Sequence, residues 1–350
     1  MVRFTRFIPL STALLLLVSA TSSFSAESDA RPVAGSRPFV DLPDSGSVAF
    51  RVTPREAQVP VQFRLSDHDF RFQTEVGYEN AAVRVTFVQF PSPVATDVSV
   101  NNTVHAEYFQ PAGDGPHPAT IVLHILGGDF LLSRTVANHL AQHGVAALFV
   151  KMPYYGPRRD RISPRRMISR DPHETVAGMT QAVLDIRRAA AWLRSRPEVN
   201  PDRVGVMGIS LGGIMSALSG AAEPRFDRVA IFLGGGNFAE FLWDSPLRQA
   251  EEFRRDWIAS GGTRDSFAKV LRPVDPVTHG PLLRGKQVLM VESRHDEVIP
   301  PANAIDLHEA IGCEPQLVWL NAGHYTAIWY LPRELVRLEQ FFKTGSQTAR

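Results

Sequence analysis

From Pro118 onward the chain alternates between two patterns of apolar residues. Continuous apolar runs predict strands that are buried on both faces, and they cover residues 119–126, 145–150, 228–233, 287–291 and 316–320. Between these runs, apolar residues recur at three- and four-residue steps, which predicts helices over residues 133–143, 172–196, 302–311 and 332–342. Alternating strands and helices predict an α/β fold with a mostly parallel central sheet and helices on both of its faces.

Before Pro118 the apolar residues follow a period of two. Short alternating stretches predict strands at residues 61–65, 70–72, 83–88 and 105–109, and prolines separate them. We therefore predict antiparallel N-terminal strands, which form a small β-region, the start of the larger sheet, or a mixture of the two. The main domain covers residues 46–345, with an N-terminal β extension at residues 46–82. Residues 237–285 contain helical patterns but no clear strand.

The first 45 residues differ from the rest. Arg3 and Arg6 precede an apolar run at residues 7–18, and small residues follow it. This pattern predicts a secretory signal peptide, residues 1–20, cleaved after Ala20. The alternative is an uncleaved anchor, although the run is short for a bilayer span. Residues 21–45 are rich in Ser, Ala, Pro and Asp, a composition that predicts a flexible leader. We therefore expect export to a periplasm or the cell exterior, with no stable membrane span after cleavage.

Composition narrows the function classes. The formal net charge is +1, which gives no reason to expect nucleic acid as a partner. Cys313 is the only cysteine, so an exported chain has no internal disulfide. The spacing of His, Cys, Asp and Glu predicts no metal site, and no motif predicts a cofactor. The sequence leaves the oligomeric state open.

One motif carries chemistry. Residues Gly208–Gly212 read Gly-Ile-Ser-Leu-Gly, between a β-branched run and a helix-favouring stretch. This is the nucleophile-elbow pattern, a sharp strand-to-helix turn that exposes Ser210 and directs the backbone N–H of Leu211 toward the same point. The alternative is a Gly-rich strand end with an idle serine.

A serine hydroxyl needs a base, and the base needs an orienting group. Asp296 follows the strand predicted at 287–291, and His324 follows the strand at 316–320. Parallel strands place their carboxyl ends on one edge of a sheet, so Ser210, Asp296 and His324 are expected to converge. Glu297 is an alternative acid, and His324 has the alternative of a structural histidine.

The chain resembles the α/β-hydrolase superfamily from about Val83 to Phe342, and within it most closely the esterases of the dienelactone-hydrolase and acetyl-esterase kind. The motifs that carry this resemblance are Gly208–Gly212, Asp296-x-x-Ile299-Pro300, Gly323-His324, and the strand ending in His124 before Gly127-Gly128. The resemblance implies that Ser210 is the nucleophile, His324 the general base and then acid, and Asp296 the carboxylate that orients the imidazole.

The resemblance also predicts the remaining site residues. The oxyanion hole combines the N–H of Leu211 with a donor after His124, either Leu126 or Gly127, of which Leu126 has the usual position. Ile125 stands where the family usually has glycine. Residues 237–285 lie where the superfamily often inserts a cap. The candidate substrate-binding residues are Gly127, Tyr154 and Trp243, although core packing explains the aromatic residues of the cap equally well.

The predicted function is an exported serine hydrolase that cleaves carboxylic esters through an acyl-serine intermediate. Its substrate is a small-molecule or polymer-linked ester. Six arginines at residues 158–170 indicate either an acidic substrate or a solvated loop paired with nearby acids. The alternative functions are a serine peptidase or amidase of the same fold, and a catalytically silent binding protein.

Overall fold

The computed structural model describes residues 39–128, 130–245 and 248–344. The predicted signal peptide and residues 21–38 of the predicted leader lie outside this part of the chain. The last residues of that leader contact the sheet, because Phe39 is buried and the Val40 carbonyl accepts a hydrogen bond from Gln110 Nε2 at 3.0 Å.

The described residues form one ten-stranded sheet in the order β1-β2-β3-β4-β6-β5-β7-β8-β9-β10. The strands are β1 (Ser45–Phe50), β2 (His68–Glu79), β3 (Val83–Pro91), β4 (Thr103–Pro111), β5 (His117–Leu123), β6 (Ala146–Lys151), β7 (Val199–Ile209), β8 (Arg228–Phe232), β9 (Gln287–Ser293) and β10 (Gln316–Leu320). Neighbours from β6 to β10 pair in parallel, whereas β1 to β4, and β4 with β6, pair antiparallel. The predicted mostly parallel sheet with antiparallel N-terminal strands is confirmed.

The helices connect these strands. They are α2 (Leu131–Gln142), α3 (Pro172–Arg194), α4 (Leu211–Ala222), α5 (Phe238–Asp244), α6 (Arg248–Ala259), α7 (Arg264–Leu271), α8 (Pro276–His279), α9 (Pro301–Ile311) and α10 (Leu331–Lys343). Short 3₁₀ turns are η1 (Glu56–Gln58), η2 (Val61–Phe63), η3 (Ser99–Asn102), η4 (Gly156–Arg158), η5 (Arg272–Val274), η6 (Gly280–Leu283) and η7 (Thr326–Tyr330). The four helices predicted from the apolar period lie within two residues of α2, α3, α9 and α10.

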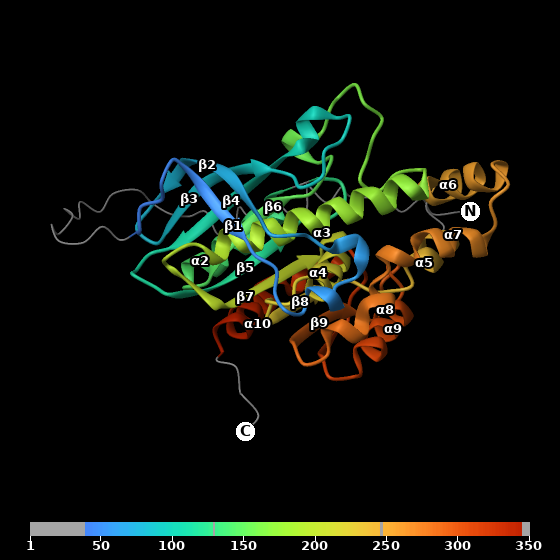
Figure 1. Ribbon diagram of the computed structural model, residues 1–350. Helices are drawn as coiled ribbons and strands as arrows, with labels where there is room; N and C mark the ends of the chain where they lie inside the picture. The colour runs from blue at the N-terminus through green and yellow to red at the C-terminus, as the bar shows by residue number, and fades with distance from the viewer. Residues whose placement is uncertain (1–38, 129, 246–247, 345–350) are drawn as a thin grey trace. The chain divides into compact units, whose positions relative to one another are not determined.

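Successive residues of the central strands enter different cores. In β5, Ile121 and Leu123 pack with the apolar sides of α3 and α4, whereas Val122 packs with those of α2 and α10. Side chains alternate across a strand, so a continuous apolar run serves both faces at once. In Figure 1 the long α3 crosses in front of the sheet. The helices therefore cover both faces, as predicted.

The sequence explains where α3 begins. The Asp171 side chain accepts a hydrogen bond from the backbone N–H of His173 at 2.8 Å, and Pro172 occupies the first turn. Both features satisfy or remove backbone donors that a helix leaves without partners. Met179 and Ile186 on the inner face are fully buried, so the apolar period that predicted this helix is also its contact with the sheet.

The strand predicted at residues 61–65 is wrong. Val61–Phe63 is a 3₁₀ turn. Phe63 is buried in the core and Leu65 packs half-buried against it, whereas Val61 is 75% exposed. The Phe63 carbonyl accepts a hydrogen bond from Arg187 Nη1 at 2.6 Å. A side chain thus satisfies this backbone group, which in a strand would bond to the backbone of a neighbouring strand. A five-residue alternation can therefore arise from a turn that places two of its apolar side chains against the core.

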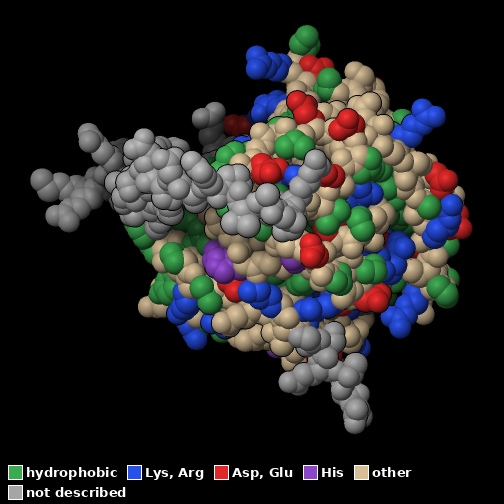
Figure 2. Space-filling view, turned by 90° about the vertical axis from the view of Figure 1, so that its left-hand side faces the viewer, with side chains coloured by type: hydrophobic (Ala, Val, Ile, Leu, Met, Phe, Trp, Pro, Cys, Tyr) green, Lys and Arg blue, Asp and Glu red, His purple; other side chains and the backbone are tan. Residues whose placement is uncertain are grey.

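The surface matches the near-neutral composition. Figure 2 shows one face of the molecule on which Lys and Arg side chains are interspersed with Asp and Glu side chains. Among the described helices, none combines the length and the apolar content that crossing a bilayer requires.

Candidate active site

Ser210 lies at the junction of β7 and α4. Its backbone angles are φ 57° and ψ −118°, a conformation that costs free energy for a residue with a side chain. A Cβ atom on Gly208 would lie 2.3 Å from the Gly212 backbone, and one on Gly212 would lie 2.5 Å from the Leu123 carbonyl oxygen. The glycines two residues before and after the serine are therefore required by backbone contact, which explains the spacing of the motif.

The structure brings the three predicted catalytic side chains together. The distance from His324 Nε2 to Ser210 Oγ is 3.0 Å, and from His324 Nδ1 to Asp296 Oδ2 it is 2.8 Å. The residues follow β7, β9 and β10, whose carboxyl ends lie at one edge of the sheet. These distances are normal hydrogen-bond lengths.

Asp296 fixes the state of the imidazole. Its Oδ1 accepts hydrogen bonds from the backbone N–H groups of Val298 and Ile299 at 2.9 and 2.7 Å, so the carboxylate has one orientation. An ionised carboxylate only accepts hydrogen bonds, so His324 Nδ1 carries the proton that faces Oδ2. In the neutral ring, Nε2 is then the acceptor for the Ser210 hydroxyl.

Glu297, the alternative acid, contacts a different part of His324. Its Oε2 accepts a hydrogen bond from the His324 backbone N–H at 2.9 Å rather than from the ring. The geometry therefore favours Asp296 as the partner of the imidazole. Glu297 instead holds the backbone of the loop that carries His324.

The candidate oxyanion donors lie on two elements. Leu211 is the first residue of α4, where backbone N–H groups lack an intrahelical acceptor. Leu126 and Gly127, after β5, line the same pocket as Ser210 and Leu211. The elements that carry the candidate donors therefore line the pocket that also contains Ser210.

His124 holds the loop that carries Leu126. Its Nδ1 donates to the Ile125 carbonyl at 2.8 Å, and its Nε2 accepts from the Met152 backbone N–H at 3.1 Å. Burial lowers the pKa of His124 to about 4, so the ring stays neutral and keeps one N–H and one acceptor. The sequence indicated this histidine as part of a motif, and the structure shows that it joins the ends of β5 and β6.

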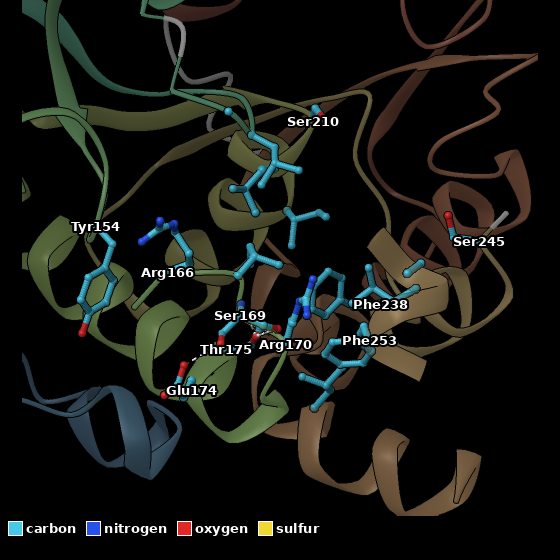
Figure 3. A pocket seen from close by; sticks show the side chains of 18 of the residues that line it. Tyr154, Arg166, Ser169, Arg170, Glu174, Thr175, Ser210, Phe238, Ser245 and Phe253 are labelled. Atoms are coloured by element: carbon cyan, nitrogen blue, oxygen red, sulfur yellow. Dashed lines mark hydrogen bonds between the residues drawn. The ribbon is translucent and has the colours of Figure 1, made fainter. Parts of the chain in front are cut away.

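A cavity of about 880 Å³ opens beside Ser210. The 154–175 segment forms one side, and α5, α6 and α7 form the other. In Figure 3, Tyr154 and Arg166 lie on one side of the pocket and Phe238 and Phe253 on the other, with Ser210 at one end. The helical segment between β8 and β9 therefore supplies an apolar wall.

Two of the three predicted substrate-binding residues line the cavity, and the third does not. Gly127 and Tyr154 line the cavity. Trp243 does not appear among the lining residues and packs against Phe267, with ring centroids 5.5 Å apart. Its place is the core of the α5–α7 segment. Tyr155, which the sequence did not single out, also lines the cavity, and burial raises the pKa of its hydroxyl to about 12.

The arginine-rich loop has two kinds of members. Arg158 is buried and pairs with Asp185 at 2.8 Å, so it is structural. Arg159, Arg166 and Arg170 line the cavity. Arg170 pairs with Glu252, whereas Arg166 Nη1 donates to the carbonyls of Ser163 and Arg165 at 3.0 and 2.7 Å. Pairing with nearby acids therefore holds for Arg158 and Arg170, whereas Arg166 binds backbone carbonyls at the cavity.

Glu292 lies near the end of β9 and interacts electrostatically with Asp296, and the sequence did not single it out. It is buried, and its Oε1 has no hydrogen-bond partner among the described residues. Burial, and then the neighbouring charge of Asp296, raise the pKa of Glu292 well above its ordinary value of 4.5. Glu292 therefore keeps its proton to a higher pH than an exposed glutamate does.

The change Glu292→Gln is expected to stabilise the protein at pH 7–8. Folding makes Glu292 take up a proton at any pH between its ordinary and its raised pKa, so the free energy of unfolding falls as pH rises through that window. Glutamine has no such proton to take up. Thermal unfolding of both proteins between pH 4.5 and pH 8 should give a melting-temperature difference that grows with pH. A difference that is constant with pH would contradict a protonated Glu292.

Residues 104–272 match the dienelactone hydrolase family. This segment runs from β4 to the end of the α5–α7 segment and contains Ser210, but it ends before Asp296 and His324. The chain is 29% identical to 2,6-dihydropseudooxynicotine hydrolase from Paenarthrobacter nicotinovorans over 184 residues, which are 49% of this chain and 45% of that protein. The chain spans less than half the length of the curated relatives that it matches.

Solved structures share the fold over 77–78% of this chain. Acetyl xylan esterase 1 from Thermoanaerobacterium sp. JW/SL YS485 superposes with a TM-score of 0.62 at 20% identity, covering 78% of this chain and 88% of that one. The acetyl xylan esterase from Paenibacillus sp. R4 gives 0.62 at 18% identity, covering 77% and 88%. At these identities the likeness establishes the fold alone.

Proposed function

We propose that this chain, a member of the α/β-hydrolase superfamily whose residues 104–272 match the dienelactone hydrolase family, is a serine hydrolase that cleaves carboxylic esters. The observation that carries the proposal is the continuous hydrogen-bonded series from Ser210 Oγ through His324 to Asp296. Such a series activates a hydroxyl that is otherwise a weak nucleophile.

In the proposed first half-reaction, Ser210 Oγ attacks the ester carbonyl carbon while His324 Nε2 takes the hydroxyl proton. The carbonyl oxygen becomes an oxyanion, which the N–H groups of Leu211 and Leu126 stabilise. The bond from carbon to the alcohol oxygen then breaks, and His324 returns its proton to the departing alcohol. The acyl group remains on Ser210 as an ester.

In the second half-reaction, water replaces the alcohol. His324 Nε2 takes a proton from the attacking water, and the same oxyanion site receives the developing charge. The bond from the acyl carbon to Ser210 Oγ breaks, the serine recovers its proton from His324, and the carboxylic acid leaves. Asp296 holds the ring and stabilises the imidazolium in both halves without taking a proton itself.

The cavity supports a small or chain-end ester. The α5–α7 wall is apolar where it faces Ser210, with Phe238, Phe241 and Phe253, and fits an acyl group or an apolar alcohol. The arginines on the 154–175 side fit a polar or acidic part of the alcohol. Two of the structural neighbours are named acetyl xylan esterases, which supports acetyl esters of carbohydrates as substrates to test first.

The test compares the cleavage of an ester with the cleavage of an amide, using two substrates that each release a coloured nitroaromatic product. We expect turnover of p-nitrophenyl acetate and no comparable turnover of an aminoacyl-p-nitroanilide, because the ester has the better leaving group. A fluorophosphonate probe should label the folded chain at Ser210. Faster anilide cleavage would favour a peptidase, and an unlabelled, folded chain would favour a silent binding protein.

A further inference from the structure

Outside the pocket, three metal-ligating side chains meet between α2 and α10. They are His139 in the last turn of α2, His143 at its C-cap and Glu339 on α10, and one ligand atom from each lies within 4.8 Å of the others. Glu339 Oε2 is 3.5 Å from His139 Nε2 and 3.8 Å from His143 Nε2. Both distances are too long for strong hydrogen bonds, so in the neutral state of the histidines the three polar atoms converge without hydrogen bonds between them.

The two histidines present the same nitrogen to the same point. They are four residues apart and share one face of α2, and their ring centroids are 4.2 Å apart. His143 Nδ1 contacts the His139 carbonyl at 2.7 Å. A carbonyl only accepts, so Nδ1 carries the proton and the neutral ring directs the bare Nε2 toward Glu339. A ring N–H fixed by a backbone carbonyl is the usual arrangement of a metal-bound histidine.

Nε2 of His139 has Glu339 Oε2 as its ion-pair contact when the ring is protonated, but the distance of 3.5 Å is long for a hydrogen bond. Nε2 of this side chain is buried and makes no hydrogen bond with the described residues. A buried nitrogen without a partner carries a free-energy cost. The geometry therefore leaves an unused lone pair, or an unused N–H, directed at the centre of the cluster.

The carboxylate is also oriented by a neighbour. Lys343 Nζ donates to Glu339 Oε1 at 2.9 Å, one turn further along α10. That contact uses one carboxylate oxygen and leaves Oε2 for the histidines. The positive charge of Lys343 weakens the attraction for a cation, so this site is expected to bind more weakly than one with an unpaired carboxylate.

We propose that His139, His143 and Glu339 bind a divalent transition-metal ion of the Zn²⁺ class. Two imidazoles and one carboxylate form a typical zinc donor set, with bonds of about 2.0–2.1 Å. Ligand atoms of a tetrahedral site with such bonds lie about 3.3 Å apart, so the observed distances require a contraction that side-chain rotation can supply. His143 is 42% exposed, which leaves room for water as the fourth ligand.

The ion would join two helices, α2 and α10, that each follow a loop at the edge of the sheet where β5 and β10 end. α2 follows the loop that carries Leu126, and α10 follows the loop that carries His324. His143 caps the far end of α2, about 18 Å along the helix from that loop at 1.5 Å per residue. The ion therefore acts on stability, with no direct role in ester cleavage.

The experiment uses the untagged full-length chain after chelator treatment and dialysis. Titration with ZnCl₂ against a chromogenic chelator should give one saturable site, and Co²⁺ should give a visible absorption band. At a hundredfold excess of Zn²⁺ over its Kd, the melting temperature should rise by about 5 °C. Turnover of p-nitrophenyl acetate should be unchanged in a His143→Ala variant.

The variants separate this site from other histidines. His143→Ala and Glu339→Gln should each weaken Zn²⁺ binding at least about 100-fold and abolish the Co²⁺ band, whereas His173→Ala, an exposed histidine on the other face of the sheet, should leave both unchanged. Glu339→Gln keeps the shape of the side chain, so it decides the question if His143→Ala does not fold. Wild-type affinity in both variants, or no saturable binding by the wild type, would overturn the proposal.

Discussion

Replacing Ser210 by alanine is expected to lower kcat for p-nitrophenyl acetate by about 10⁴- to 10⁶-fold. Without Oγ no acyl-serine forms, and the remaining groups stabilise only the attack of water. The residue keeps a Cβ at the strained φ of 57°, and the Ser210 backbone N–H still donates to the Phe232 carbonyl at 2.8 Å. The melting temperature should therefore change little. Steady-state kinetics and thermal unfolding on the same preparation measure both quantities.

A matched control, Ser219, lies on α4, the helix that follows Ser210. Ser219 is buried on α4, and its hydroxyl makes no hydrogen bond with the described residues. Ser219→Ala therefore removes no bond, and we expect wild-type kcat and an equal or slightly higher melting temperature. If Ser210→Ala keeps more than about a tenth of the activity while the control behaves as expected, another residue is the nucleophile.

Asp296→Asn is expected to lower kcat by about 10⁴-fold with little change in stability. The asparagine carbonyl oxygen can still accept from the backbone of Val298 and Ile299. Its amide N–H groups then face His324 Nδ1, where the imidazole needs an acceptor. The ring adopts the other tautomer, with Nε2 protonated, and can no longer accept the Ser210 proton. Single-turnover acylation with a chromogenic ester measures this step directly.

Glu297→Gln provides the comparison. Glu297 Oε2 accepts a hydrogen bond from the backbone N–H of His324, and an amide oxygen can replace that acceptor. We expect less than about a tenfold loss in kcat, because an exposed backbone hydrogen bond contributes about 1 kcal/mol. If Glu297→Gln costs more than Asp296→Asn, the alternative acid is the catalytic one.

Local sequence was sufficient wherever the physical cause was local. The elbow needs Gly208 and Gly212 because their Cβ atoms would overlap backbone, and that requirement is visible as spacing. The buried strands were found because residues covered on both faces must be apolar throughout. Asp296 and His324 were found because each follows a strand, and parallel strands end at one edge. The same reasoning proposed Glu297, and only coordinates distinguish two adjacent acids.

Short patterns were insufficient where a distant residue decided the outcome. The alternation at residues 61–65 predicted a strand, but Arg187 takes the Phe63 carbonyl and the segment turns. Trp243 fitted a pocket or a core equally well, and Phe267 keeps it in the core. The arginines of the 158–170 loop differ in environment: Arg158 is buried in an ion pair with Asp185, whereas Arg166 lines the cavity. In each case the partner is far away in sequence, so no local pattern carries the information.

The sequence by itself determined the α/β architecture and the order of the candidate serine, acid and base, because periodicity, glycine spacing and strand ends are properties of neighbouring residues. Tertiary structure alone decided which acid faces the imidazole and that Glu292 is buried. It also decided that His139 and His143 meet Glu339, about two hundred residues later in the chain. Those outcomes depend on which helices and strands pack side by side, and packing brings together residues that the linear pattern keeps apart.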